Sequence, residues 1–240
     1  MADNLIGHRV ELLDKGWIEL LDLMPHPDTG VTGDLAIVNA ARTSFLGESK
    51  GLEQDKKLLF YLMRQRHTTP FEMVEFKFRV RAPLVTWWQW ARHRTWSFSA
   101  QSGRYTPFEE SDFYLPVDWR KQATDNKQAS MGNLAEEQSV ELTAKLAAHY
   151  EKSYQFYQEA LNAGVAKELA RLFLPGFSVY YTWVAKVDAH NLMHFLKLRM
   201  ADGAQYEIRI YAQAIYEHFF KPTLPWTAEA FEQYLLPSKV

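Results

Sequence analysis

The chain has 240 residues, 47% of them hydrophobic and 15% aromatic, which excludes a disordered chain and supplies a substantial core. A net charge of −2, and no apolar run approaching roughly 18 residues, argue against a nucleic-acid binder, a membrane-surface binder and a membrane span. Cysteine is absent, which excludes disulfides and a thiolate nucleophile, and without a secretory signal pattern we expect a cytoplasmic protein.

The N-terminal third predicts a hairpin, two helices and a strand. Two apolar stretches within residues 9–23 flank an Asp-Lys-Gly sequence, which is typical of a short hairpin. Helices are predicted over about 33–43, where Thr32 can cap the N-terminus, and over about 52–66. In residues 73–81 apolar and charged side chains alternate strictly, which indicates a strand with one polar face.

The middle of the chain predicts helices separated by one strand. Pro83 is favoured in a first helical turn, and the helix it opens is predicted to continue to Arg94. Residues 126–163 are rich in Ala, Leu, Glu and Tyr and predict a long helical stretch. Residues 178–187 are β-branched and aromatic, which indicates a strand.

The C-terminal part predicts helices over about 188–200 and 203–221, and Thr227 can cap a last one. No repeat and no linker-like composition interrupts the chain. We therefore predict an α+β fold, in which residues 1–240 form a single domain with a mostly antiparallel sheet packed by helices, plus a long helical segment.

The segment from Arg92 to Tyr105, RHRTWSFSAQSGRY, is the most polar and most basic of the candidate sites. Gln89, Arg92 and His93 stand at i, i+3 and i+4, so they share one helix face. Guanidinium groups bind phosphate oxygens bidentately, which favours a phosphorylated ligand. For any single arginine, a basic helix C-terminus that complements the helix dipole is an equally good explanation.

Other polar clusters have structural alternatives. Thr69 to Glu72 matches a capping box, and His67 before it can be a structural histidine. His190 and His194 have a spacing compatible with zinc, but no glutamate lies between them to act as a general base, so we expect no metal site.

Two further predictions concern charged side chains of the C-terminal part. Asp188 and Arg199 are eleven residues apart and are predicted to share a helix face. Arg171 lies in the apolar segment ARLFLP and would be buried if its apolar neighbours are, in which case it needs an anionic partner.

The spacing from Arg92-His93-Arg94 to Ser102, followed by Gly-Arg-Tyr, resembles the signature of the flavin-dependent thymidylate synthases. Further segments resemble that family in the same order, and only residues around 110–165 show little resemblance. These segments are AARTSF (40–45), RHTTPFE (66–72), APLVTWWQWARHR (82–94), ARLFLP (170–175), DAHNLMHFLKLRMADGAQYEIRIYA (188–212) and PWTAEAF (225–231).

The resemblance implies a homotetramer that makes dTMP from dUMP, with FAD, with NADPH as reductant and with methylenetetrahydrofolate as carbon donor. It implies active sites between subunits, and it gives catalytic roles to Arg199, Ser102 and His67, the last near flavin and folate. The flavin contacts it implies are Ser44, Thr69, Arg92, His93, Arg94, Asp188, His190 and His194. The dUMP contacts it implies are Gln89, Arg92, Ser102, Gly103, Arg104, Arg171 and Arg199.

One position departs from the family pattern. Ser99-Ala100 stands where the family commonly has Asn-Glu, so the carboxylate found there in the family is missing. The resemblance further implies that Arg104 and Arg171 hold the dUMP phosphate and that Arg199 lies near the uracil ring. Because the chain has no cysteine, attack of a thiolate on the uracil ring is excluded, and the resemblance implies reduction by flavin hydride instead.

Two other classes of function stay open at this point. Arginines interleaved with Trp96, Phe98 and Tyr105 are compatible with a module that stacks nucleic-acid bases. The pair His190 and His194 is compatible with a metal-dependent nucleotide hydrolase.

Overall fold

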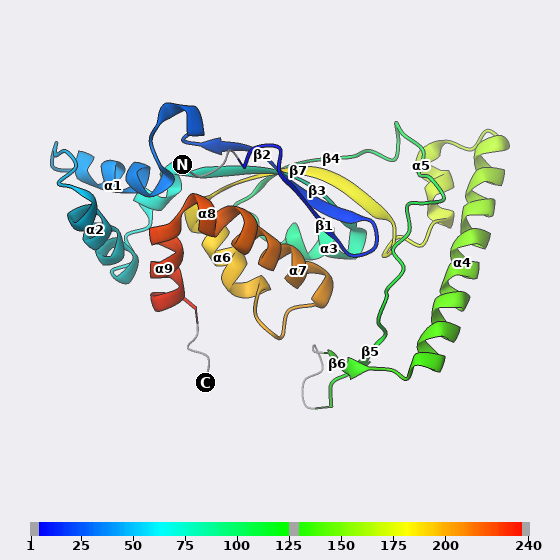
Figure 1. The fold of residues 1–240 in the computed structure, drawn as a ribbon. Helices are drawn as coiled ribbons and strands as arrows, with labels where there is room; N and C mark the ends of the chain where they lie inside the picture. Colours follow the sequence, from blue (N-terminus) through cyan, green and yellow to red (C-terminus); the bar gives the residue numbers. More distant parts are fainter. Residues whose placement is uncertain (1–4, 125–129, 237–240) are drawn as a thin grey trace.

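A computed structural model describes residues 5–124 and 130–236 of the chain. Its centre is a five-stranded sheet in which every pair of neighbouring strands is antiparallel (Figure 1). The α+β prediction with a mostly antiparallel sheet is therefore confirmed. In spatial order the strands are β1 (Arg9–Leu12), β2 (Gly16–Met24), β3 (Glu75–Pro83), β7 (Tyr180–Asp188) and β4 (Ser97–Ala100).

The central strand β3 shows why the alternating sequence forms a strand with two unlike faces. Phe76, Phe78 and Val80 are fully buried, whereas Lys77 and Arg79 between them are exposed. Successive side chains of a strand point to opposite faces, so the apolar set faces one layer of helices. The predicted strand and the predicted N-terminal hairpin are both confirmed.

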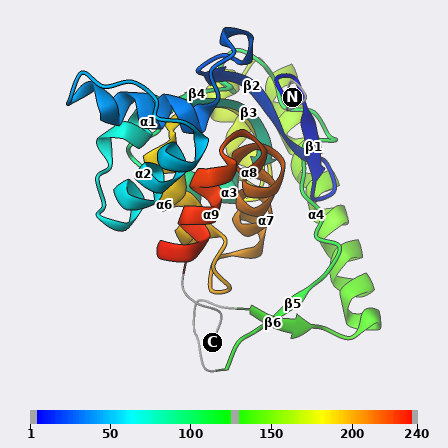
Figure 2. The same ribbon diagram turned by 60° about the vertical axis from the view of Figure 1, so that its left-hand side comes forward.

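Helices cover one face and one end of the sheet (Figures 1 and 2). The C-terminal helices lie on the sheet face, while α1 (Gly33–Thr43) and α2 (Leu52–Arg64) lie at one end, beside the 3-10 turns η1 (Pro27–Thr29) and η2 (Thr69–Met73). The elements on the face are α6 (Ala189–Arg199), α7 (Tyr206–Ile215), the π-helical turn η4 (Tyr216–Phe220), α8 (Lys221–Thr223) and α9 (Pro225–Tyr234).

A cluster of tryptophans fills the core between the sheet and α6. Trp90, Trp96 and Trp183 are at most 5% exposed, and Trp90 stacks on Phe195 of α6 with 4.8 Å between ring centroids. Trp90 is the last residue of α3 (Leu84–Trp90), the short helix that follows β3. The cluster therefore anchors the end of α3, where the basic segment begins.

An arm lies beyond the other end of the sheet and has a small core of its own (Figure 1). Its long helix α4 (Glu136–Asn162) packs Tyr150 and Tyr157 against Phe108 and Phe113. The remaining elements of the arm are the hairpin of β5 (Arg120–Gln122) and β6 (Ser130–Asn133), α5 (Lys167–Ala170) and the turn η3 (Arg171–Phe173).

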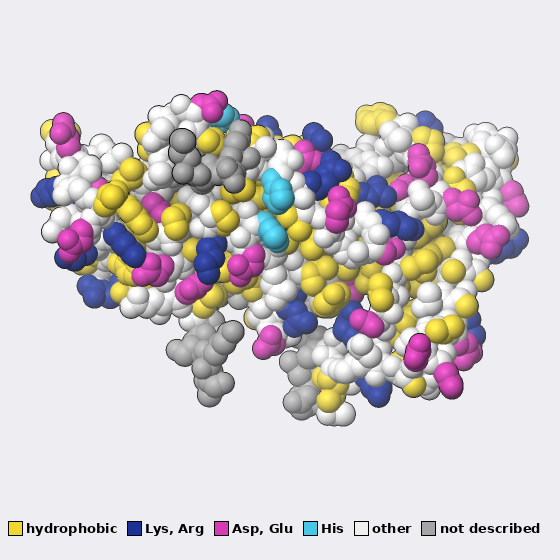
Figure 3. All heavy atoms as spheres, viewed as in Figure 1, with side chains coloured by type: hydrophobic (Ala, Val, Ile, Leu, Met, Phe, Trp, Pro, Cys, Tyr) yellow, Lys and Arg dark blue, Asp and Glu magenta, His cyan; other side chains and the backbone are white. Residues whose placement is uncertain are grey.

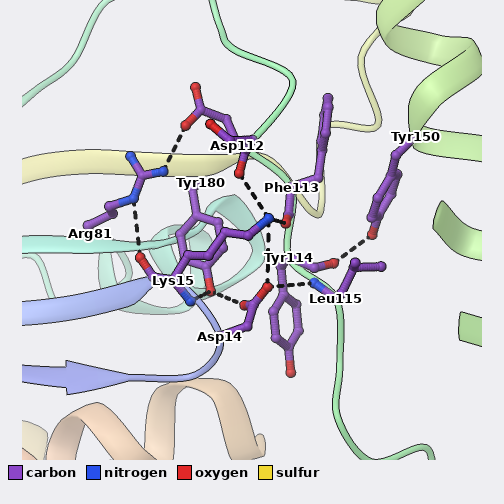
Figure 4. Close-up of polar contacts among 10 residues, drawn as sticks. Asp14, Lys15, Arg81, Asp112, Phe113, Tyr114, Leu115, Tyr150 and Tyr180 are labelled. Atoms are coloured by element: carbon purple, nitrogen blue, oxygen red, sulfur yellow. Dashed lines mark hydrogen bonds and ion pairs between the residues drawn. The ribbon is translucent and has the colours of Figure 1, made fainter.

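The turn between β1 and β2 holds the chain that leads from β4 to the arm (Figure 4). Asp14 accepts hydrogen bonds from the Tyr180 hydroxyl at 2.6 Å and from the Leu115 amide at 3.2 Å. Lys15 Nζ donates to the Ser111 and Phe113 carbonyls at 3.0 and 3.1 Å. The Asp-Lys turn of the hairpin thus tethers the connection to the arm at three points and strand β7 at a fourth.

Several predicted boundaries are wrong. The helix predicted from residue 126 begins at Glu136, because residues 130–133 form strand β6, in which Gly132, with φ of +49°, lies at a bulge; residues 126–129 of that prediction lie outside the described residues. The helix predicted to reach Arg94 ends at Trp90, where the His93 amide donates to the Trp90 carbonyl at 2.9 Å and turns the chain toward β4, a strand that was not predicted. Pro83 ends β3 and only precedes the helix.

Further differences lie at helix starts and along the last helices. The helix predicted over 203–221 begins at Tyr206 and becomes π-helical at Tyr216. Thr227 is no cap: it lies inside α9, whose first amides are capped by Asp34, with Trp226 N at 2.8 Å and Thr227 N at 3.1 Å.

The two other predicted caps had different outcomes. The capping box predicted at Thr69 to Glu72 is absent, because the 3-10 turn there has Thr68 at its cap position with no side-chain bond. Thr32 does cap α1, as predicted, by accepting from the Leu35 amide at 3.3 Å.

Charged side chains of both signs are interspersed over the face in Figure 3, and apolar side chains are exposed over the arm. Within the described residues, no helix is both long enough and apolar enough to cross a membrane.

Candidate active site

Arg199 is the centre of a hydrogen-bonded cluster at the end of α3. Its Nε donates to His93 Nε2 at 3.0 Å, its Nη1 to Gln89 Oε1 at 3.0 Å, and its Nη2 to the Gln89 carbonyl at 3.1 Å. Arg199 ends α6 and Gln89 lies in the last turn of α3, so two helix C-termini meet around one cation. Negative dipole ends and an otherwise unpaired carbonyl suit a guanidinium there.

His93 is neutral in this cluster. Burial, together with the charges of Arg199 and His194, lowers the pKa of His93 to about 4. Since its Nε2 accepts from Arg199, its proton resides on Nδ1. The pKa of Arg199 is lowered by burial and by nearby Arg92, yet a guanidinium keeps its charge in proteins. The cluster therefore carries one fixed positive charge and a neutral imidazole.

A second cluster forms where the chain leaves β4. Ser102 Oγ accepts from the Arg104 amide at 3.3 Å, and the Tyr105 amide donates to the Ser102 carbonyl at 3.0 Å, which makes a tight turn. Gly103 is required at this turn, because a Cβ there would lie 2.6 Å from the Phe108 ring. The same Cβ position is 3.5 Å from Nη1 of Arg171, so the turn and Arg171 are neighbours.

Two arginines of the second cluster share one acidic residue. Arg104 Nε lies 2.8 Å from the Glu168 carboxylate, and Arg171 Nε donates to the Glu168 carbonyl at 3.3 Å. Arg104 and Arg171 are exposed. The condition for burial of Arg171 is not met, because its neighbours Leu172 and Phe173 are themselves exposed on the surface turn η3. Exposed guanidiniums next to a backbone turn can bind an incoming phosphate.

A hollow of about 240 Å³ lies between η2, α6 and α9. Its rim is basic, with Arg66, His67, His190, His194 and Lys197, and its wall is apolar. The apolar wall consists of Leu62, Met63, Phe71, Met193, Phe231 and Leu235. His194 links the hollow to the Arg199 cluster, since its ring centroid lies 6.1 Å from that of His93. An apolar wall with a cationic rim suits a flat ring system that carries negative charge.

Comparison with known proteins places this geometry in a family. Residues 20–226 match the family model described as thymidylate synthase complementing protein. A flavin-dependent thymidylate synthase of Thermus thermophilus is 47% identical over 227 residues, which cover 95% of this chain and 79% of that protein. One from Dictyostelium discoideum is 40% identical over 237 residues, covering 97% and 77%. This chain belongs to the flavin-dependent thymidylate synthase family.

A solved structure agrees in fold as well as in sequence. The UMP/dUMP methylase PolB from Streptomyces cacaoi, bound with 5-Br UMP, is 33% identical and superposes with a TM-score of 0.79, covering 94% of this chain and 97% of that one. The structure of the same methylase bound with 5-Br dUMP gives a TM-score of 0.81, covering 94% and 98%.

Several of the remaining predicted site residues lie apart from both clusters, except Arg92, which is close enough to Arg199 to lower its pKa. Ser44 is exposed at the end of α1, and Thr69 is exposed at the start of η2. Arg92 and Arg94 are exposed in the turn after α3. Asp188 caps α6 by accepting from the Asn191 amide at 2.9 Å, at the opposite end of the helix from Arg199. Asp188 and Arg199 therefore do not form one cluster.

The departure at Ser99-Ala100 lies on strand β4, where Ala100 is exposed opposite Trp183. Among residues 5–124 and 130–236, no three His, Cys, Asp or Glu side chains are grouped to hold a metal ion.

The sequence interpretation missed two polar residues of this chain: Gln205, which contacts the Arg199 cluster, and Glu207, which contacts Gln205. Gln205 and Glu207 lie in the quoted segment 188–212 but received no role. Gln205 contacts Gln89, which is 116 residues away in the chain. The available signal was the polar pair flanking Tyr206 at the start of an amphipathic helix.

Proposed function

We propose that this chain catalyses the reductive methylation of dUMP to dTMP, with FAD bound, NADPH as reductant and methylenetetrahydrofolate as carbon donor. The observation that carries the proposal is the Arg199 guanidinium, which hydrogen bonds to Gln89 and His93 hold in place. A cytoplasmic location, where these small molecules are available, belongs to the same proposal.

In this proposal the protein's own residues bind and orient dUMP and neutralise its negative charge. Arg199 stabilises negative charge on the uracil carbonyls and N3, and neutral His93 keeps the guanidinium in place without adding a second charge. Arg104 and Arg171 exchange their contacts with Glu168 for the dUMP phosphate, and Ser102 orients the nucleotide by a hydrogen bond.

When bound, the flavin would supply the hydride, which no protein side chain can supply. His67, His190 and His194 would line its place in the hollow. Ser44, Thr69, Asp188 and the exposed arginines Arg92 and Arg94 are assigned to the same cofactor.

We further propose a homotetramer with active sites between subunits, in which residues 1–240 of each chain form a single domain. A hollow of about 240 Å³ is smaller than the roughly 300–1,000 Å³ of ordinary ligand pockets, so a dinucleotide needs further walls. Large apolar side chains next to the second cluster are exposed, such as Leu172 at 76% and Phe177 at 62%, and a second copy would cover them.

The functional proposal is tested by product formation. FAD-loaded protein, incubated without oxygen with NADPH, methylenetetrahydrofolate and dUMP, is expected to yield dTMP by chromatography. Omitting any one substrate serves as the control. No dTMP from flavin-loaded, folded protein contradicts the proposal.

Mixing inactive variants tests the shared site. Arg199→Ala and Arg171→Ala change different clusters, so mixed oligomers are expected to recover activity at about one site in four if each site takes one cluster from each subunit. Mixing Arg92→Ala with Arg199→Ala is the matched control. Arg92 lies near enough to Arg199 to lower its pKa, so both variants damage the same cluster and the mixture is expected to recover no activity. An active monomer in light scattering would refute the shared site.

A further inference from the structure

A chain of polar side chains leads away from the Arg199 cluster. Gln89 Nε2 donates to Gln205 Oε1 at 2.8 Å, and Gln205 Nε2 donates to Glu207 Oε2 at 2.9 Å. The other carboxylate oxygen of Glu207 accepts from Arg120 Nη2 at 2.5 Å and from the Tyr114 hydroxyl at 3.3 Å. Four separate elements are thus linked: α3, the start of α7, β5 of the arm and the segment that leads to the arm.

The carboxylate of Glu207 is the fixed end of this chain. Glu207 is only 4% exposed, and burial alone would raise its pKa. Hydrogen bonds from Gln205 and Arg120, together with the charge of Arg120, lower the pKa below its usual value instead. The group is therefore ionised at neutral pH, and an ionised carboxylate can only accept hydrogen bonds.

An acceptor at one end sets the direction of every bond in the chain. Gln205 must turn its NH₂ group to Glu207, so its carbonyl faces Gln89. Gln89 must then turn its own NH₂ group to Gln205, which leaves its carbonyl for Arg199 Nη1. With the Gln89 amide reversed, two donors would face each other at Arg199, at the cost of an unmade bond in a partly buried site.

We propose that Gln205 and Glu207 are positioning residues, which fix the orientation of the Gln89 amide and thereby hold the Arg199 guanidinium for the uracil ring of dUMP. The inference rests on the proposed function, because it takes Arg199 to contact the uracil. A merely structural role in capping or packing α7 would account for the bond between Glu207 and Arg120, but it would not account for the bond between Gln205 and Gln89.

Exchanging donor and acceptor tests the direction of the chain. In Gln205→Leu the link to Gln89 is lost at similar side-chain size. In Gln205→Glu the new carboxylate faces that of Glu207, and the two repel each other. In Glu207→Gln the ionised acceptor that fixes the orientation of the Gln205 amide is lost. In the double variant Gln205→Glu/Glu207→Gln, a carboxylate at position 205 again accepts from the Gln89 NH₂ group. Tyr114→Phe is the control, since it removes a bond to Glu207 and leaves the bond to Gln205.

dUMP binding to FAD-loaded protein is measured by calorimetry, after flavin content and melting temperature have been checked. We expect Gln205→Leu, Gln205→Glu and Glu207→Gln each to weaken dUMP binding about tenfold, the loss of one oriented hydrogen bond. We expect the double variant to return within about threefold of wild type, and Tyr114→Phe to stay within about twofold.

The outcomes separate this inference from the proposed function. Wild-type protein that does not bind dUMP contradicts the proposed function. If wild type binds dUMP, unchanged binding in Gln205→Leu, or a double variant no better than its single variants, overturns the positioning role. Should Gln205→Leu not fold, the three charge-exchange variants decide the question alone, because a merely structural role predicts no recovery in the double variant.

Discussion

Replacing Arg199 with alanine is expected to slow the single-turnover conversion of dUMP by roughly 10²–10³-fold, the usual cost of losing one donor that stabilises developing charge. The guanidinium is held by Gln89 and His93 at the meeting of two helix ends, so no other described cation can take its place without moving. Flavin content is expected to stay unchanged, since Arg199 does not line the hollow.

Two comparisons make this result specific. Ser102→Ala is expected to cost only roughly 0.5–3 kcal/mol, because in the proposed function Ser102 orients dUMP by a hydrogen bond and forms no covalent bond. Arg9→Ala is the matched control: Arg9 forms an ion pair with Glu19 at 2.5 Å on the edge strand, and exposed pairs contribute little. A dead Ser102→Ala beside an active Arg199→Ala would overturn the proposed mechanism.

Replacing Arg42 with alanine is expected to lower the free energy of unfolding by about 3–5 kcal/mol, measured by urea denaturation. Arg42 Nη2 donates at 2.5 Å to Asp55, whose side chain is fully buried between α1 and α2. Ser49 also donates to this carboxylate, at 2.5 Å. Without Arg42 the carboxylate keeps its burial and loses its counter-charge. Lys57→Ala, which breaks an exposed pair with Glu53, is the control and should leave the free energy of unfolding nearly unchanged.

The same pair gives the Arg42→Ala effect a pH dependence. Burial alone would raise the pKa of Asp55, but hydrogen bonds from Ser49 and Arg42 bring it below the usual 3.8. A carboxyl group whose pKa is lower in the folded state stabilises the fold above its unfolded pKa, and this is lost as the pH falls through the folded pKa. The difference between wild type and Arg42→Ala should therefore narrow as the pH falls below about 3.8. A difference that is constant from pH 7 to acid would contradict this role of Asp55.

Local patterns predicted those elements whose signals are local. Thr32 before an amphipathic stretch gave α1 with its observed start, and strict alternation gave β3 to within two residues at each end. The hairpin before α4 was missed because its alanine- and glutamate-rich surroundings predict helix, although Gly132 needs a positive φ that favours glycine.

The site was predictable only in part. The spacing of the arginine segment pointed to Arg92 through Arg104, but the role of Gln205 depends on a contact across 116 residues, which no periodicity can show. Burial of Arg171 depended on burial of its apolar neighbours, but Leu172 and Phe173 are both exposed on a surface turn. Asp34 caps a helix 192 residues further along the chain, which likewise has no local signal.

The tryptophan cluster beneath α6 gives the protein an intrinsic optical readout. Trp90, Trp96 and Trp183 are enclosed, and no described residue accepts a hydrogen bond from their indole nitrogens. Such indoles emit at shorter wavelengths than hydrated ones. Phe195 stacks on Trp90 and meets His93 edge-on at 4.9 Å, so the emitting rings lie two side chains from the hollow. Flavins absorb in the range where indoles emit, so the fluorescence of the cluster would dim as the hollow fills and brighten as it empties.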